Sequence, residues 1–172
     1  MQEQKRAFVS VSHADHNMDP LKSTAEFVVE LAKVGFQITA GPLTIQSLPL
    51  NKRELKIEEA NLVKDLLKGR IGDFNIPFNV VVCPIPEKTE VQSMEQVEPV
   101  RVFLLAWGAR NYERCAVITD LNQYNKILGL LRNGGITLQE RRRLAIEAID
   151  RINDYLGKCV HTLCKEEQEE QE

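Results

Sequence analysis

Two loops have hydroxyl-bearing residues of the kind that bind phosphate, and the second loop also contains a glycine. The first follows Ser10 and Ser12, and the second follows Ala40 and contains Gly41 and Thr44. If each loop follows a parallel strand and precedes a helix, its backbone N–H groups and the helix dipole attract an anion. The pattern therefore predicts a phosphate site, and a pair of ordinary solvated loops is the equal alternative.

Two groups of side chains have the chemistry of metal ligands but not the spacing. The groups are His13, Asp15 and His16 in one turn, and Cys159, His161 and Cys164 near the C-terminal end. Neither matches the paired Cys-x-x-Cys spacing of a zinc site. Cys83 and Cys115 fall within apolar segments, where cysteine acts as a small hydrophobic residue. We predict no metal site.

The N-terminal third has the pattern of a strand–helix–strand unit. Residues Arg6–Ser12 form an apolar strand-like run, and Asp19-Pro20 is a typical helix start. The helix should extend to about Lys33, with Phe36–Ala40 as the next strand.

The middle of the chain supplies two further strands. Phe78–Pro84 is an unbroken apolar run of the kind found in a parallel strand that is covered on both faces. Val102–Ala109 has helical spacing, and Cys115–Thr119 is a second buried strand that ends at Asp120. Lys52–Glu59 is expected to be a charged loop or solvated face, and 59–68 a short helix.

The C-terminal third is predicted to be helical. A helix is expected near Gln123–Leu131, and Thr137 with Glu140 forms a capping box that starts a long helix ending near Leu156. Strands that alternate with helices indicate an open, mostly parallel sheet in a three-layer α/β fold. We expect one domain over 1–158 and a polar, disordered tail over 159–172.

Composition excludes several classes of function. The net charge of −3 argues against a nucleic-acid-binding protein, and no apolar run approaches the ~18 residues of a membrane span. Met1–Arg6 is polar and shows no secretory signal, so a cytoplasmic location is expected.

Three segments carry a resemblance to a known family. Val102–Tyr112 resembles the Val-Thr-Leu-Leu-Arg-Ala-Ala-Ala-Lys-Asn-His block of the cyclohydrolase domain of bifunctional AICAR transformylase/IMP cyclohydrolase. Cys115–Tyr124 is similar to the family's strand and Asp/Glu-x-x-x-Tyr turn, and Thr137–Ile149 resembles its Ser-Leu-x-x-Arg-Arg helix. The resemblance implies a methylglyoxal-synthase-like fold, which is Rossmann-like.

The resemblance also implies site residues. It carries phosphate or ribotide binding over to Ser10, Ser12, Gly41, Thr44 and Arg70. The family's Lys in the first loop falls on Ala14, and Pro42 lacks the N–H group that a phosphate cradle would use.

For the chemistry itself, the resemblance implies roles for Glu98, Arg110 and Asn111. Ring closure of a formamido-carboxamide ribotide needs a polarised carbonyl and proton transfer. Arg110 replaces a Lys of the family and Glu98 an Asp, whereas the family's Lys-Thr-x-His segment is missing after Arg70. Cys83-Pro84 occupies the place of its Asn and Tyr.

Three functions follow as alternatives. The first is a short IMP cyclohydrolase-like protein of purine nucleotide biosynthesis that binds a purine ribotide phosphate. The second is a non-catalytic nucleotide-binding regulatory or scaffold module, and the third is a phosphate lyase of the methylglyoxal synthase type, for which Gly72-Asp73 is a weak match. The resemblance implies no cofactor. Members of the family self-associate, and the long C-terminal helix could serve that contact, so the resemblance implies a homodimer.

Overall fold

A computed structural model describes residues 4–11, 18–50, 55, 57–59, 78–85, 93 and 97–169 of this 172-residue chain. Within helices, the side chains of residues 18–20, 166, 168 and 169 are not described. Several expectations lie outside the described residues. They are the short helix at 59–68 except for its first residue, the turn at 13–16, the Gly72-Asp73 match, and the site residues Ser12 and Arg70.

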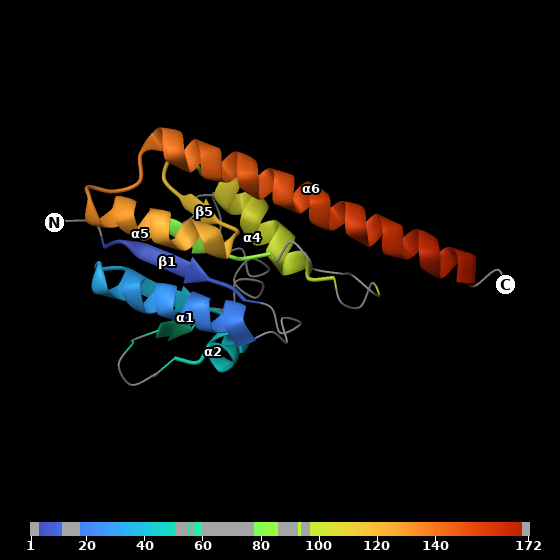
Figure 1. Ribbon diagram of the computed structural model, residues 1–172, viewed down its shortest axis with the longest axis horizontal. Helices are drawn as coiled ribbons and strands as arrows, with labels where there is room; N and C mark the ends of the chain where they lie inside the picture. Colours follow the sequence, from blue (N-terminus) through green and yellow to red (C-terminus); the bar gives the residue numbers. More distant parts are fainter. Residues whose placement is uncertain are drawn as a thin grey trace, which may run out of the picture.

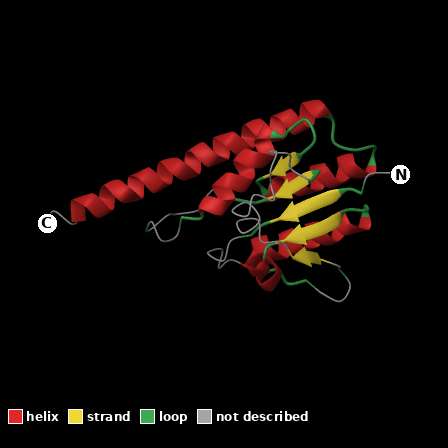
Figure 2. Ribbon diagram, turned by 180° about the vertical axis from the view of Figure 1, so that it is seen from behind, coloured by secondary structure: helices red, strands yellow, loops and turns green. Residues whose placement is uncertain are grey.

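The described residues form a five-stranded parallel sheet in the order β3-β2-β1-β4-β5. Its strands are β1 (Arg6–Val9), β2 (Gln37–Ala40), β3 (Ile57–Glu59), β4 (Val80–Val82) and β5 (Ala116–Ile118). Phe8 is in register with Thr39 on one side and Val81 on the other. All five arrows point the same way in Figure 2, so the carboxyl ends of the strands share one edge.

Helices cover both faces of the sheet (Figure 1). One face packs against α1 (Met18–Lys33) and α5 (Tyr124–Arg132), and the other packs against α4 (Pro99–Arg110) and α6 (Leu138–Glu169). The short helix α2 (Pro42–Ser47) follows β2, and a 3-10 turn, η2 (Leu121–Gln123), precedes α5. This arrangement confirms the predicted three-layer, parallel α/β fold.

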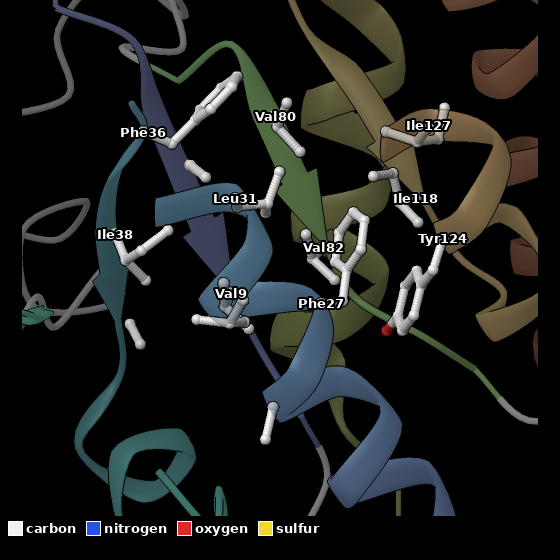
Figure 3. Packing of buried hydrophobic residues seen from close by; sticks show 14 of the residues in the cluster. Val9, Phe27, Leu31, Phe36, Ile38, Val80, Val82, Ile118, Tyr124 and Ile127 are labelled. Carbon is white, nitrogen blue, oxygen red and sulfur yellow. The ribbon is translucent and has the colours of Figure 1, made fainter. Parts of the chain in front are cut away.

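Alternating side chains of the strands divide the core into two clusters. Val9, Val80 and Val82 belong to the cluster beneath α1 and α5, whereas Phe8 and Val81 belong to the cluster beneath α4 and α6. Figure 3 shows the first cluster, in which helix and strand side chains interdigitate. Successive residues of a strand point to opposite faces, so both faces must be covered when every strand residue is apolar.

Two polar segments form more regular secondary structure than the sequence predicted. Helix α6 was expected to end near Leu156, but it runs to Glu169, through most of the segment expected to be a disordered tail. Lys, Glu and Gln, which dominate that segment, are good helix formers as well as disorder-promoting residues. The segment 52–59 was expected to be a charged loop or a solvated face; its last three residues form the strand β3, in which Glu58 and Glu59 are exposed.

Gly108 lets α4 lie close to the sheet. A Cβ atom at this position would be 2.7 Å from Cγ2 of Val117 on β5. A Cβ at Gly129, in the middle of α5, would meet nothing within 4 Å. The close packing of α4 on β5 therefore favours a glycine at position 108, whereas the packing around α5 leaves room for a larger residue at position 129.

Replacing Gly108 with alanine should lower the free energy of unfolding by about 1–3 kcal/mol, because the added methyl group overpacks the α4–β5 contact. Gly129→Ala is the matched control and should raise the free energy of unfolding by up to about 1 kcal/mol, from helix propensity alone. Urea unfolding of both variants measures the difference. Equal effects of the two substitutions would contradict the close packing at Gly108.

Candidate functional site

The two loops predicted to bind phosphate lie side by side at the carboxyl edge of the sheet. Ser10 follows β1, and its N–H donates to the carbonyl of Val82 at 2.8 Å. The next residue, Val11, donates its N–H to the hydroxyl oxygen of Thr44 at 3.2 Å. Thr44 is buried in α2, so this bond joins the β1 loop to the β2–α2 turn. The structure thus brings together Ser10, Gly41 and Thr44, as predicted from the topology.

Gly41 is the N-cap residue of α2. Its φ of −71° is open to any residue, and its carbonyl accepts the N–H of Ile45 at 3.0 Å. Pro42 occupies the first helical position and offers no N–H. The described residues of the two loops, 10–11 and 41–44, include no Lys or Arg. Any anion bound there would rely on backbone N–H groups and hydroxyls.

Glu98 lies where α4 begins. Its carboxylate pairs with Nε of the buried Arg101 at 3.1 Å, and its N–H donates to the hydroxyl oxygen of Tyr155 at 3.1 Å. The carboxylate therefore holds a guanidinium at the base of α4. Whether it also acts on a substrate stays a prediction.

Arg110 and Asn111 lie at the opposite edge of the sheet from Ser10 and Thr44. The carbonyl of Asn111 accepts the N–H of Cys115, immediately before β5 begins, at 2.9 Å. The side-chain amide of Asn111 donates to the carbonyl of Trp107 at 2.8 Å and so caps α4. A 12-residue helix is about 18 Å long, so α4 separates Arg110 from Glu98 by roughly that distance. These residues do not form one cluster with the loop residues.

Asp120 follows β5 at the carboxyl edge and organises a part of the structure that the sequence did not reveal. It caps η2 by accepting the N–H of Asn122 at 2.8 Å, and it pairs with Arg151 of α6 at 2.7 Å. The side-chain oxygen of Gln123 accepts the N–H groups of Thr119 and Asp120. The only sign of this arrangement in the sequence was the position of Asp120 after an apolar strand, because its partner Arg151 lies 31 residues away.

A charged groove of about 570 Å³ runs beside Asp120, between η2, α5 and α6. Within it, Gln123 donates to Glu147 at 2.7 Å, and Arg143 pairs with Glu147. At its edge, Glu140 binds both Lys126, at 2.8 Å, and Arg143, at 2.6 Å. These opposite charges neutralise one another. The groove is therefore lined by ion pairs, which tie α6 to the turn after β5.

The Arg143 guanidinium, helped by Lys126, lowers the pKa of Glu140 to about 2. This value lies below the ~4.3 of an unfolded chain, so the ionised carboxylate stabilises the fold above pH ~4.3. That stabilisation should be lost as the pH falls toward 2. Because Lys126 and Arg143 are partly exposed, we expect only about 1 kcal/mol. Glu140→Gln should show this loss at pH 7, about half of it at pH 3 and little of it near pH 2, by urea unfolding. A loss independent of pH would contradict the ion pairs.

Tyr124, which the resemblance aligns with a family tyrosine, is part of the core. Its hydroxyl shares a hydrogen bond with Thr24 at 2.8 Å, and its ring stacks on Phe27 with centroids 4.1 Å apart (Figure 3). Burial raises the pKa of the Tyr124 hydroxyl. The residue therefore joins α1 to α5.

The described cysteines are all free thiols. Cys83 and Cys115 are fully buried, as predicted for their strands, and burial raises the pKa of the Cys115 thiol to about 12. In α6, Cys159 is buried whereas Cys164 is exposed. Within the described ranges, no three His, Cys, Asp or Glu side chains gather as a metal site would require. The described helices also include none with the length and apolar character to cross a bilayer.

Comparisons with known proteins agree with the resemblance seen in the sequence. Residues 108–172 match the family described as the AICARFT/IMPCHase bienzyme. The chain is 30% identical over 118 residues to the bifunctional purine biosynthesis protein PurH of Chloroflexus aurantiacus, a match that covers 69% of this chain and 22% of that protein. It is 24% identical to PurH of Mycobacterium ulcerans, over 88% of this chain and 34% of the relative.

The chain thus spans between 22% and 34% of the length of these relatives. The crystal structure of ForH shares the fold, with a TM-score of 0.69 at 18% identity, over 93% of this chain and 99% of ForH. These comparisons confirm the resemblance to an IMP cyclohydrolase domain, and they are consistent with the methylglyoxal-synthase-like fold.

Proposed function

We infer that this chain, which carries an IMP cyclohydrolase-like domain, binds the phosphate of a purine ribotide between the β1 loop and the β2–α2 turn. The observation that carries the proposal is the hydrogen bond from Val11 N–H to the Thr44 hydroxyl oxygen, which sets the two loops side by side. Ligands of open parallel sheets bind at the carboxyl ends of the strands, which is where these loops lie. The Thr44 hydroxyl accepts this bond and keeps its own proton for donation to a phosphate oxygen.

The loops lack a lysine or arginine among their described residues, so phosphate alone should bind weakly. A ribotide adds a base and a sugar, whose burial contributes affinity that the phosphate lacks. The proposal therefore predicts selectivity for the whole nucleotide over inorganic phosphate.

A thermal melt of the purified protein with IMP, AICAR, formylated AICAR, AMP, GMP or inorganic phosphate tests the proposal. A ligand at ~100 times its dissociation constant adds about 2.7 kcal/mol, which raises Tm by several degrees in a domain of this size. We expect IMP or formylated AICAR to raise Tm and phosphate alone to leave it unchanged. If no compound in the panel raises Tm, the proposal fails.

Thr44→Val provides the residue-level test, because it removes the hydroxyl and keeps the shape. The variant should lose most of the ligand-induced rise in Tm. Thr162→Val is the matched control, since the Thr162 hydroxyl donates to a helix carbonyl in α6, far from the loops in sequence. It should keep the full rise.

A second candidate is a nucleotide-binding module without catalytic activity, with a regulatory or scaffold role. The observation that favours it is the separation of Arg110 and Asn111 from Ser10 and Thr44 by the length of the strands. Residues at opposite edges do not act together on one small substrate within one chain. Incubation with formylated AICAR distinguishes the two: binding without formation of IMP supports the module, and formation of IMP supports the enzyme. Phosphate release from a triose phosphate would instead point to the lyase.

A further inference from the structure

Helix α6 has an apolar stripe that is exposed in the part of the chain that the structure describes. Ile146, Ile149, Leu156, Val160 and Leu163 are between 42% and 59% exposed. The buried residues of the helix, among them Ala145, Ala148, Ile152, Tyr155 and Cys159, face α4 and β5. Each exposed residue follows a buried one in sequence, so the two stripes lie side by side on the helix.

The spacing of the exposed stripe is that of a coiled-coil seam. Ile146, Asn153 and Val160 recur every seven residues, and Ile149, Leu156 and Leu163 do the same three positions later. These are the a and d positions of consecutive heptads, which pack against another helix with the same repeat. From Ile146 to Leu163 the seam is about 26 Å long. Asn153, which is exposed, is its one polar member.

We propose that a second copy of this chain covers the seam, with its α6 antiparallel to the first. In that arrangement an a residue meets a d residue in every layer: Ile146 meets Leu163 of the second copy, and Ile149 meets Val160. The seam is therefore complementary to itself, as a two-fold interface requires.

Charges at the two ends of the seam select the antiparallel orientation. The next d position before Ile146 is Arg142, and the next a position after Leu163 is Glu167, and both are exposed. Antiparallel helices place Arg142 of one copy opposite Glu167 of the other, at both ends. Parallel helices would place each charge opposite its own copy, which is repulsive.

Asn153 also fits this arrangement. It lies three residues from Leu156, its partner position, so the two copies of Asn153 are about 4.5 Å apart along the helix axis. At that separation the two amides can bond to each other across the two-fold axis. A polar residue at a single a position fixes the register at some cost in stability.

The helix is already formed and accessible, which lowers the cost of association. Its buried stripe is held by α4 and β5, so binding does not have to order it. Figures 1 and 2 show its C-terminal half extending beyond α4, away from the sheet. That half of one copy can lie along the first half of α6 in the other.

Sedimentation of the intact chain tests the proposal. We expect a dimer whose dissociation constant is raised by about 100-fold or more in Val160→Glu, because the substitution places a carboxylate in the apolar seam. Leu138→Glu is the matched control, since Leu138 is exposed on the same helix but lies outside the seam. It should leave the dimer unchanged, and circular dichroism should show native helix content in both variants. A wild-type monomer at high concentration, or a dimer that Val160→Glu does not weaken, overturns the proposal; the face would then belong to another partner.

Charge reversal tests the orientation separately. Arg142→Glu and Glu167→Arg should each weaken the dimer, by about 10-fold, since each creates two like-charge contacts. The double variant should restore the wild-type dissociation constant. If the double variant is no tighter than the single ones, or if the single ones have no effect, the antiparallel pairing is wrong.

Discussion

Replacing Leu105 with alanine is expected to lower the free energy of unfolding by about 3–5 kcal/mol. Leu105 is 0% exposed and lies in the cluster where α4 meets the sheet and α6. Removing three carbon atoms there costs the transfer free energy of the side chain and leaves a cavity that the rigid strands cannot close. Because total stabilities of such domains are about 5–15 kcal/mol, the variant should be close to its folding limit.

Leu138→Ala controls for the change of residue type, since Leu138 is 47% exposed at the start of α6. It should alter stability by less than about 0.5 kcal/mol. Urea unfolding followed by circular dichroism measures both. A loss below about 1.5 kcal/mol for Leu105→Ala would mean that α4 can settle into the vacated space.

Arg141→Met should lower the free energy of unfolding by about 2–4 kcal/mol, although Arg141 is neither in the core nor in an ion pair that the structure shows. Its guanidinium donates to the carbonyls of Tyr112 at 3.0 Å, Glu113 at 2.8 Å and Ile136. The bonds to Tyr112 and Glu113 fasten the start of α6 to the turn that follows α4, and the bond to Ile136 fastens it to the loop before α6. Methionine keeps the length of the side chain and removes every donor.

Arg141→Lys should recover only part of this loss, because an ammonium group cannot reproduce the planar fork that reaches separate carbonyls. Arg114→Met is the control, since Arg114 is exposed in the same turn. Its effect should be within about 0.5 kcal/mol. If Arg141→Lys matches the wild-type protein, a single positive charge is sufficient there and the three-bond geometry is not required.

Most of the fold could be predicted from the sequence, because the apolar pattern has few interpretations. Phe78–Pro84 and Cys115–Thr119 are short apolar runs, and only strands covered on both faces need such runs. The structure places β4 and β5 inside them. Trp107, within the segment that has helical spacing, is buried in the core with 4% exposure.

The errors concern elements that bury little. β3 has two exposed glutamates in three residues, so its composition is that of a loop, and only pairing with β2 makes it a strand. The end of α6 has the composition of a disordered tail, yet it continues a helix that is already nucleated by packing. The hydrophobic pattern of the sequence therefore predicts neither the strand β3 nor the C-terminal extension of α6.

The candidate site was predictable only where topology brings residues together. Ser10 and Thr44 follow neighbouring parallel strands, so their proximity follows from the sheet. Arg110 and Asn111 were assigned from resemblance, but α4 returns against the strand direction and carries them to the far edge. The Asp120–Arg151 pair joins distant segments through a helix orientation that no local pattern encodes.

The strand β3 forms one border of the sheet, and its brevity and charge affect how copies of the protein meet. An uncovered border strand is a template on which another molecule's strand can add, the first step toward aggregated sheets. A strand from another molecule could pair with only three residues of β3. Two of these are glutamates with exposed side chains, and Glu58 already binds Arg6 and Gln37. The short length and the negative charge of β3 therefore disfavour edge-to-edge aggregation through this strand at high protein concentration.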